Sequence, residues 1–463
     1  NGKNGHRMMQ KIAKNQWKPI NDINEKEPQD GYDIISTIDV YIQDIAHHAL
    51  LKQLEYYSAD HGCVVVMETK TGHIKAISNL GRAEDGSYYE TQNYAIMESH
   101  EPGSTFKLMD LIAVLDDKKA DTGTVYNSFG GEIEYFKRKV RDSHKGGYGK
   151  ISLARGFEVS SNTVLVQSVY ESYKNNPKQF VDRINSYGLN KPLGLPIKGE
   201  GIPIIPQPGT NRWSGVALPW MAFGYGLSIT PLQTLTLYNA VANNGVMVKP
   251  IFVSEIKEWN KTIKKYDTEV INPKICSQET LNKVQAVLKN VVKKGTGSKL
   301  YSKDFSMAGK TGTAQVNYKD KSQLYYASSF AGYFPADNPK YSCIVVVHKP
   351  NVAAGYYGAD VAGPVFKRIA QKIFTDSPSM NHVKNIDAKV VSQEKNYSEY
   401  YKKVEKEEQI VPNVKGMEGM DAVALLENLG LKVKVIGVGR VKKQSLTSGQ
   451  AFNKNQTIII ELS

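Results

Sequence analysis

The chain has 463 residues, of which 41% are hydrophobic and 23% are charged, and its formal net charge is +13. This length exceeds what one ordinary hydrophobic core holds, so two or more domains are expected, and the composition is that of a globular protein. The basic balance fits an anionic neighbour such as a membrane surface or a cell-wall polymer. The lysines do not interleave with aromatic residues as in a single-strand binder, so no nucleic-acid partner is expected.

The sequence predicts neither a metal site nor a membrane span. Its three cysteines and nine histidines show no spacing typical of metal ligands. His61 and the pair at 47–48 have no ligand partners at useful spacing and are interpreted as structural or exposed. No run of 18 apolar residues occurs, so no segment of this sequence is expected to cross a bilayer.

The periodicity of apolar residues predicts the elements of the first half. Alternation indicates strands, and a spacing of three to four residues indicates helices. In chain order, the expected elements are an extended run at 33–39, a helix at 42–50, a hairpin of 63–67 with 74–78, a buried helix after Ser104, a loop-like region at 116–150 and a helix at 153–170.

Strands dominate the expected elements near the end of the larger domain. A helix begins at Thr230, which pairs with Gln233 in a capping box, and Pro231 suits its first turn. The further expected elements are strands at 307–316, 330–334 and 341–348, and a last helix from Pro364. Strand clusters at both ends with helices between them predict an α+β fold on a mostly antiparallel sheet.

Composition divides the chain further. Residues 377–409 are charged and polar and are interpreted as a linker. After them comes a compact stretch with one helical pattern and two alternating strands. The expected domains are a remnant of a preceding domain at 1–30, a large domain at 31–376, the charged linker at 377–409 and a small domain at 410–463.

Three short motifs occur in order: S-T-F-K at 104–107, S-S-N at 160–162 and K-T-G-T at 310–313. Each is weak alone, because S-x-x-K and K-T-G also occur elsewhere in the chain. Context distinguishes them. Only Ser104 begins a long apolar helix, and only Lys310 lies on a strand rich in small residues, where a substrate backbone can approach closely.

These residue types suit nucleophilic catalysis by a serine. A serine hydroxyl needs a base, and Lys107 shares a helix face with Ser104. Burial and the second cation, Lys310, would both lower the pKa of Lys107. Ser160 is placed to relay a proton to a leaving amine, and Asn162 to hold Lys107 and the substrate amide.

The remaining motif residues suit substrate binding. The backbone N–H groups of Ser104 and Thr313 are candidates for an oxyanion hole. Lys310, Thr311 and Thr313 are candidates for binding a terminal carboxylate, with Gly312 giving room for the substrate. The alternative makes Ser104 a helix cap and Lys107 a surface residue. The coincidence of three motifs in fitting contexts favours catalysis.

The three motifs resemble those of penicillin-binding proteins and serine β-lactamases. Further segments resemble class B penicillin-binding proteins over residues 28–375: P-G before Ser104, G-Y-G at 224–226, K-T-G-T-A-Q at 310–315 and Y-Y-G at 356–358. The C-terminal stretch resembles a PASTA domain, with V-P-N-V at 411–414, L-G-L at 429–431 and Gly449. One PASTA domain behind a class B transpeptidase points to a septal, division-type enzyme.

The resemblance implies a mechanism and partners. Ser104 would attack the D-Ala-D-Ala bond of a peptidoglycan stem peptide, and an amine of a neighbouring stem peptide would then attack the acyl-enzyme. β-Lactams would acylate Ser104, and no cofactor is needed. The family implies a membrane-embedded glycan polymerase and division proteins as partners. It also implies a periplasmic location, with an N-terminal membrane anchor outside this sequence and a pedestal domain of which residues 1–30 are the last piece.

Two other functions remain open. The first is hydrolysis on the same fold, by a D,D-carboxypeptidase or a β-lactamase. Class A β-lactamases use an additional glutamate, and no E-x-x-L-N segment occurs between Asn162 and Lys310, which disfavours rapid β-lactam turnover but not a carboxypeptidase. The second is a non-catalytic β-lactam sensor or peptidoglycan-binding scaffold, which the complete set of motifs disfavours. Whether the PASTA-like domain binds muropeptides also stays open.

Overall fold

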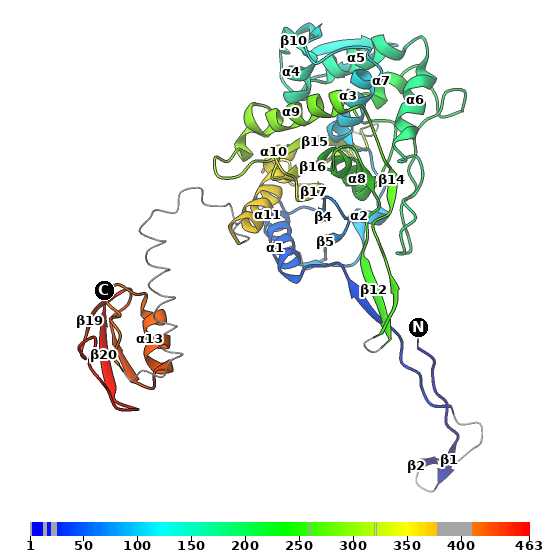
Figure 1. Ribbon diagram of the computed structural model, residues 1–463. Coiled ribbons are helices and arrows are strands. Elements are labelled where there is room, and N and C mark those ends of the chain that lie inside the picture. Colours follow the sequence, from blue (N-terminus) through cyan, green and yellow to red (C-terminus); the bar gives the residue numbers. More distant parts are fainter. Residues whose placement is uncertain are drawn as a thin grey trace. The chain divides into compact units, whose positions relative to one another are not determined.

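The computed structural model describes residues 2–12, 16–19, 26–258, 261–318, 320, 322–376 and 410–463. It divides into two compact units, Asn1–Ser377 and Pro378–Ser463 (Figure 1). The expected charged linker at 377–409 lies outside the described residues. In the part of the chain that is described, no helix is both long and apolar enough to cross a membrane.

A six-stranded sheet organises the larger unit. Its strand order is β15-β16-β17-β4-β5-β6, and all neighbouring strands run antiparallel. The strands are β4 (His61–Glu68), β5 (Ile74–Arg82), β6 (Tyr88–Tyr89), β15 (Ala308–Val316), β16 (Tyr325–Phe334) and β17 (Tyr341–His348). β17 pairs with β4 along its full length, which confirms the expected closure of an antiparallel sheet by distant segments.

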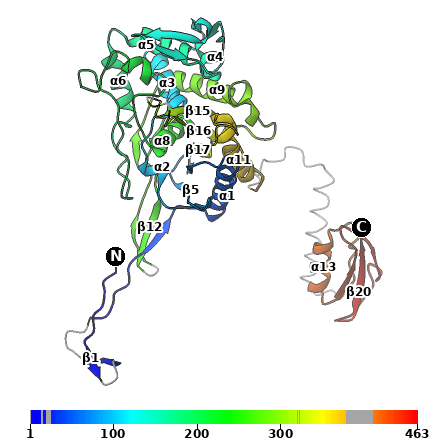
Figure 2. The ribbon, with the colours of Figure 1, turned by 180° about the vertical axis from the view of Figure 1, so that it is seen from behind.

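Helices cover both faces of this sheet (Figures 1 and 2). On β17, Ile344 and Val346 join one core cluster, while Val345 and Val347 join the other. Both faces are buried, so the strand reads as a continuous apolar run rather than an alternating one. One layer consists of α1 (Val40–Tyr57), α10 (Gly358–Val361) and α11 (Gly363–Asp376), and the other contains α8 (Pro231–Ala242) and α9 (Gln278–Lys294).

A mainly helical region follows β6 in the sequence. Its helices are α2 (Tyr94–Met97), α3 (Lys107–Asp116), α4 (Leu153–Glu158), α5 (Asn162–Tyr173), α6 (Pro177–Ser186) and α7 (Ala217–Met221). The expected single helix at 153–170 is wrong, because α4 and α5 are separate. The capping box of α8 is confirmed, since Thr230 Oγ1 accepts from Gln233 N at 3.2 Å and Thr230 N donates to Gln233 Oε1 at 3.0 Å.

The expected loop at 116–150 is also wrong. It contains two small sheets, β7 (Val125–Asn127) with β10 (Lys150–Ser152) and β8 (Glu132–Tyr135) with β9 (Arg138–Arg141). These strands have three or four residues each, too few for alternation to be visible among the charged and glycine residues.

Smaller elements complete the larger unit. β13, β12 and β3 form one sheet, β11 pairs with β14, and β1 pairs with β2. Their bounds are β1 (Met9–Ile12), β2 (Gln16–Pro19), β3 (Asp33–Ser36), β11 (Met247–Val248), β12 (Val253–Glu258), β13 (Lys261–Lys265) and β14 (Val270–Asn272), with 3-10 turns η2 (Gly103–Thr105), η3 (Phe129–Gly131) and η4 (Ser298–Leu300).

The second unit is a small sheet with one helix. It contains α13 (Gly419–Asn428), β18 (Lys432–Ile436), β19 (Val441–Gln444) and β20 (Thr457–Leu462). β20 lies in the centre, parallel to β18 and antiparallel to β19. The helix and the two expected strands, β18 and β20, are confirmed, and β19 was missed because its residues after Val441 are polar and mostly exposed. The α+β class is confirmed.

Candidate active site

Ser104 lies in the 3-10 turn η2, and Lys107 is the first residue of α3. The candidate nucleophile Ser104 therefore precedes the α-helix by a tight turn, rather than beginning the helix as expected. Gly103 makes this turn possible, because its φ of +55° lies in the left-handed region that favours glycine. Its N–H donates to the carbonyl oxygen of Gly224 at 3.1 Å, and a Cβ on Gly224 would overlap Gly103.

Lys107 is fully buried and hydrogen-bonded to the second motif. Its Nζ donates to the Ser160 carbonyl oxygen at 2.8 Å and to Asn162 Oδ1 at 2.6 Å, and it lies 3.3 Å from Ser160 Oγ. Burial lowers the pKa of Lys107 to about 7, although the carboxyl groups of Asp142 and Asp110 act in the opposite direction. At neutral pH the amine is therefore divided between its charged and neutral forms.

The second motif lies where α4 and α5 are interrupted. Ser160 has a φ of +58°, which reverses the chain between the two helices. Ser161 is the N-cap of α5, and its Oγ donates to Asp142 Oδ2 at 2.9 Å. Asn162 Nδ2 donates to the Arg141 carbonyl oxygen at 2.7 Å. The end of β9 thus fixes the amide that accepts from Lys107.

Asp142 is a supporting residue that the sequence interpretation missed. Its Oδ1 accepts from the backbone N–H of Thr163 at 2.9 Å, and its Oδ2 accepts from Thr163 Oγ1 at 3.0 Å. The residue lies in the region taken for a loop, so no pattern pointed to it. Its contacts orient the first turn of α5 and the motif residue Ser161.

The third motif lies on β15, next to η2. Lys310 is fully buried, and its Nζ donates to the Thr311 carbonyl oxygen at 3.0 Å. Burial, and then the neighbouring charge of Lys107, hold the pKa of Lys310 well below its ordinary value. The sequence predicted the opposite direction of influence, with Lys310 lowering the pKa of Lys107, whose pKa is lowered here by burial.

Small side chains let β15 pass close to the 3-10 turn η2. A Cβ on Gly312 would overlap Ser329 Oγ and approach Thr105 Cγ2 to 3.0 Å. The side chains on either side of Gly312 are held in place, since Thr311 Oγ1 lies 2.6 Å from Thr296 Oγ1 and Thr313 Oγ1 accepts from Gly358 N at 3.0 Å. The structure thus brings all eight predicted site residues onto adjacent elements.

A buried carboxyl group beneath Lys107 was also missed. Asp110 follows Lys107 by one turn of α3, and neither of its carboxyl oxygens has a hydrogen-bond partner. Burial raises the pKa of Asp110 well above its ordinary value, against the opposing effect of Lys107. A protonated Asp110 leaves Lys107 without a buried counter-ion at this position.

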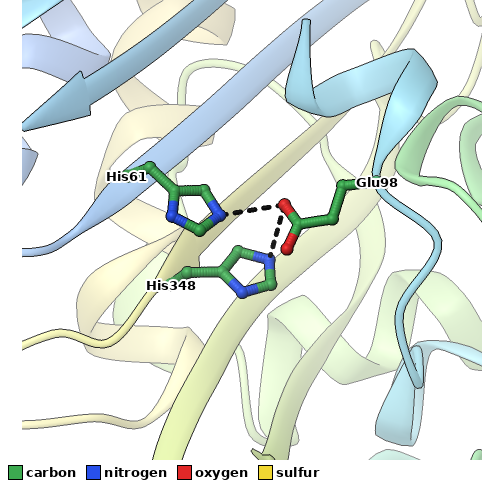
Figure 3. A group of neighbouring side chains, drawn as sticks. All are labelled: His61, Glu98 and His348. Carbon is green, nitrogen blue, oxygen red and sulfur yellow. Dashed lines mark hydrogen bonds and ion pairs between the residues drawn. The ribbon is translucent and has the colours of Figure 1, made fainter. Parts of the chain in front are cut away.

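The interpretation of His61 as a residue without ligand partners is wrong. Figure 3 shows His61 on β4, Glu98 after α2 and His348 at the end of β17, with their side chains directed toward one another. One potential ligand atom from each lies within 4.8 Å of the others, the only such group among the described residues. No spacing along the chain could reveal this group, because pairing of β4 with β17 brings His61 and His348 together.

The antiparallel sheet, the turn η2 that carries Ser104, and buried Lys107 are the features of the class of penicillin-binding proteins and serine β-lactamases. The sequence profile of the penicillin binding protein transpeptidase domain matches residues 62–371, and the chain belongs to that family. The PASTA domain profile matches residues 409–463. The resemblance drawn from the motifs is thereby confirmed.

Two curated relatives illustrate this membership. Stage V sporulation protein D of Bacillus subtilis (strain 168) is 28% identical over 453 residues, covering 94% of this chain and 66% of that protein. The probable peptidoglycan D,D-transpeptidase PenA of Neisseria gonorrhoeae is 30% identical over 360 residues, covering 74% of this chain and 57% of that protein. The chain thus spans less than two thirds of the length of these relatives.

A solved structure supports the same family. Penicillin binding protein 3 from Mycobacterium tuberculosis, complexed with aztreonam, is 26% identical and superimposes with a TM-score of 0.66. The match covers 76% of this chain and 80% of that chain.

Proposed function

We propose that this protein is a serine-type peptidoglycan D,D-transpeptidase that cross-links stem peptides in septal wall synthesis, on the periplasmic face of the inner membrane. The observation that carries the proposal is the environment of Lys107, a buried amine with a pKa of about 7 held by Asn162. Family membership and the name of the relative PenA support it. The septal role rests on the PASTA domain.

Acylation begins with neutral Lys107 accepting the proton of Ser104 Oγ. The oxygen forms a bond to the carbonyl carbon of the penultimate D-Ala, and the backbone N–H groups of Ser104 and Thr313 stabilise the oxyanion. The C–N bond then breaks. The proton passes from Lys107 by way of Ser160 Oγ, 3.3 Å away, to the departing D-Ala amine.

The second half-reaction reverses these roles. An amine of another stem peptide attacks the acyl ester and loses a proton to the Lys107–Ser160 pair. The ester C–O bond breaks, Ser104 recovers its proton, and the cross-linked peptide leaves.

Lys310 and its neighbours provide recognition of the substrate. Lys310, Thr311 and Thr313 bind the terminal carboxylate, and Gly312 lets the peptide lie close to β15. An anionic carboxylate beside Lys310 favours the charged form of that lysine, which burial disfavours in its absence. Binding of the substrate carboxylate therefore favours the charged form of Lys310, with which the carboxylate pairs.

Intact-mass spectrometry with excess benzylpenicillin tests the proposed nucleophile. We expect the stable gain of one penicilloyl group, absent in Ser104→Ala. A separate sample without drug, given a peptide ending in D-Ala-D-Ala and an amine acceptor, should yield the transfer product. Transfer only to water would indicate a D,D-carboxypeptidase, rapid release of opened penicillin a β-lactamase, and unmodified protein with intact drug a scaffold.

A further inference from the structure

Three side chains outside the motifs form a compact group of nitrogen and oxygen donors (Figure 3). His61 Nε2 lies 2.9 Å from Glu98 Oε2, and His348 Nε2 lies 3.8 Å from the same oxygen. Two histidines and one glutamate are a donor set that Zn²⁺ uses in proteins. The group has no role in the proposed transfer reaction.

The separations suit a single ion. With Zn–N and Zn–O bonds of about 2.0–2.2 Å, donors of a tetrahedral site lie roughly 3.4 Å apart. The two measured separations bracket that value. The rings of His61 and His348 are stacked at 4.4 Å with an angle of 11°, so one ring must rotate to direct both lone pairs at the ion. The side-chain torsion involved, χ2 of histidine, is broad.

His61 is already oriented as a metal ligand. Its Nδ1 lies 2.8 Å from Asp60 Oδ2, which leaves Nε2 directed at Glu98. Histidine ligands usually donate their other ring N–H to a carboxylate in this way, which fixes the tautomer and makes the ligating nitrogen more basic. An ion would replace the proton that His61 shares with Glu98.

His348 is buried with poorly satisfied ring nitrogens. The side chain is 3% exposed, Nδ1 has no hydrogen-bond partner, and the 3.8 Å separation of Nε2 from Glu98 exceeds a hydrogen bond. Nε2 is the ring nitrogen that lies on the side of Glu98, where an ion would bind. Burial of a polar ring without hydrogen bonds is costly, and an ion at Nε2 would offset that cost on the side that faces Glu98.

A cavity gives the group access to solvent. It has a volume of about 690 Å³, and Glu98, His100 and His348 are among its lining residues. It supplies an entry path and room for a water molecule as a fourth ligand, which a site with three protein ligands requires.

We propose that His61, Glu98 and His348 bind one divalent transition-metal ion, with Zn²⁺ the best match to the donors, and that the ion fixes the segment leading to the nucleophile. Glu98 lies six residues before Ser104, and the intervening His100 is held to Ile229 by backbone hydrogen bonds of 3.2 and 3.1 Å. An ion would tie this segment to both β4 and β17.

The test titrates the EDTA-treated full chain with Zn²⁺ by calorimetry and with Co²⁺ by visible absorption. We expect one equivalent to bind, the absorption of four-coordinate Co²⁺, and a higher melting temperature. Glu98→Gln keeps an oxygen acceptor for His61, and His61→Gln changes a partly exposed residue, so both should fold. Each should weaken binding at least about tenfold.

The matched control is His48→Gln, which removes an exposed histidine 3.3 Å from Asp44 and should bind the ion like the parent chain. Circular dichroism in EDTA establishes that each variant is folded. Absence of one-equivalent binding by the parent chain would overturn the proposal. Unchanged binding by both folded variants would also overturn it, because the ion would then lie elsewhere.

Discussion

Lys107 is the residue whose protonation should set the pH dependence of acylation. Its pKa of about 7 means that the neutral form, which in the proposed mechanism accepts the proton of Ser104, declines as pH falls below 7. The rate constant for acylation by benzylpenicillin should therefore fall by about tenfold per pH unit on the acid side. Quenched-flow mass spectrometry between pH 5 and 9 measures it, and a flat profile from pH 5 to 7 would contradict this role.

Asp110 should make stability depend on pH. Its pKa is raised in the folded chain. At a pH between the unfolded-state pKa of ~3.9 and the folded-state pKa, the folded chain therefore binds more protons than the unfolded chain. Stability is therefore lost as pH rises, by up to about 1.4 kcal/mol per unit for one proton. Asp110→Asn mimics the protonated form. Urea unfolding should therefore show that the free energy of unfolding of the variant, relative to that of the parent chain, is higher at pH 8 than at pH 5.

Asp116→Asn is the control for that experiment. Asp116 lies on the same helix, but hydrogen bonds from Ser277 and Thr280 and the charge of Arg183 lower its pKa despite burial. The contribution of ionised Asp116 to stability is lost only as pH falls through the acidic range below ~3.9. The effect of this substitution should be constant between pH 5 and 8. If Asp110→Asn also changed the free energy of unfolding by the same amount at pH 5 and pH 8, Asp110 would have to be ionised in the folded chain.

At the scale of elements, the close passage of β15 past η2 should be sensitive to a single methyl group. In Gly312→Ala, the new Cβ would overlap Ser329 Oγ and press on Thr105, so the strand must shift. We expect the free energy of unfolding to fall by about 1–3 kcal/mol and acylation to slow by about a hundredfold. Gly123→Ala is the matched control, because nothing lies within 4 Å of its Cβ. Equal, small effects of both changes would argue against tight packing between β15 and η2.

The elements that sequence reasoning predicted best are those whose core positions repeat. The helix α1 buries Ile42, Ala46 and Leu50 on one face, and β4 with β5 forms the expected hairpin. The break between α4 and α5 was not predictable, because apolar spacing continues across it. Ser160 adopts a left-handed φ there, and contacts from the distant Asp142 hold the chain around it.

For the whole molecule, separate cores predict separable domains. The two core clusters of the larger unit contain residues between Ile42 and Ile373, whereas the third contains residues between Val411 and Ile460. A chain of residues 26–376 should therefore fold and be acylated by benzylpenicillin within about twofold of the full-length rate, since each domain has its own core. Intact-mass kinetics measure this, and a folded fragment that is not acylated would show that residues outside 26–376 contribute to catalysis.

The sequence by itself determined the fold class, the family and the eight candidate site residues, because local spacing and short motifs are properties of neighbouring residues. It also predicted that burial would lower the pKa of Lys107, which the structure confirms. Only the tertiary structure decided the roles of Asp142 and Asp110 and the grouping of His61, Glu98 and His348. Those arrangements depend on burial and on strand pairing between residues up to hundreds of positions apart, and no local pattern encodes which distant side chains share a low-dielectric environment.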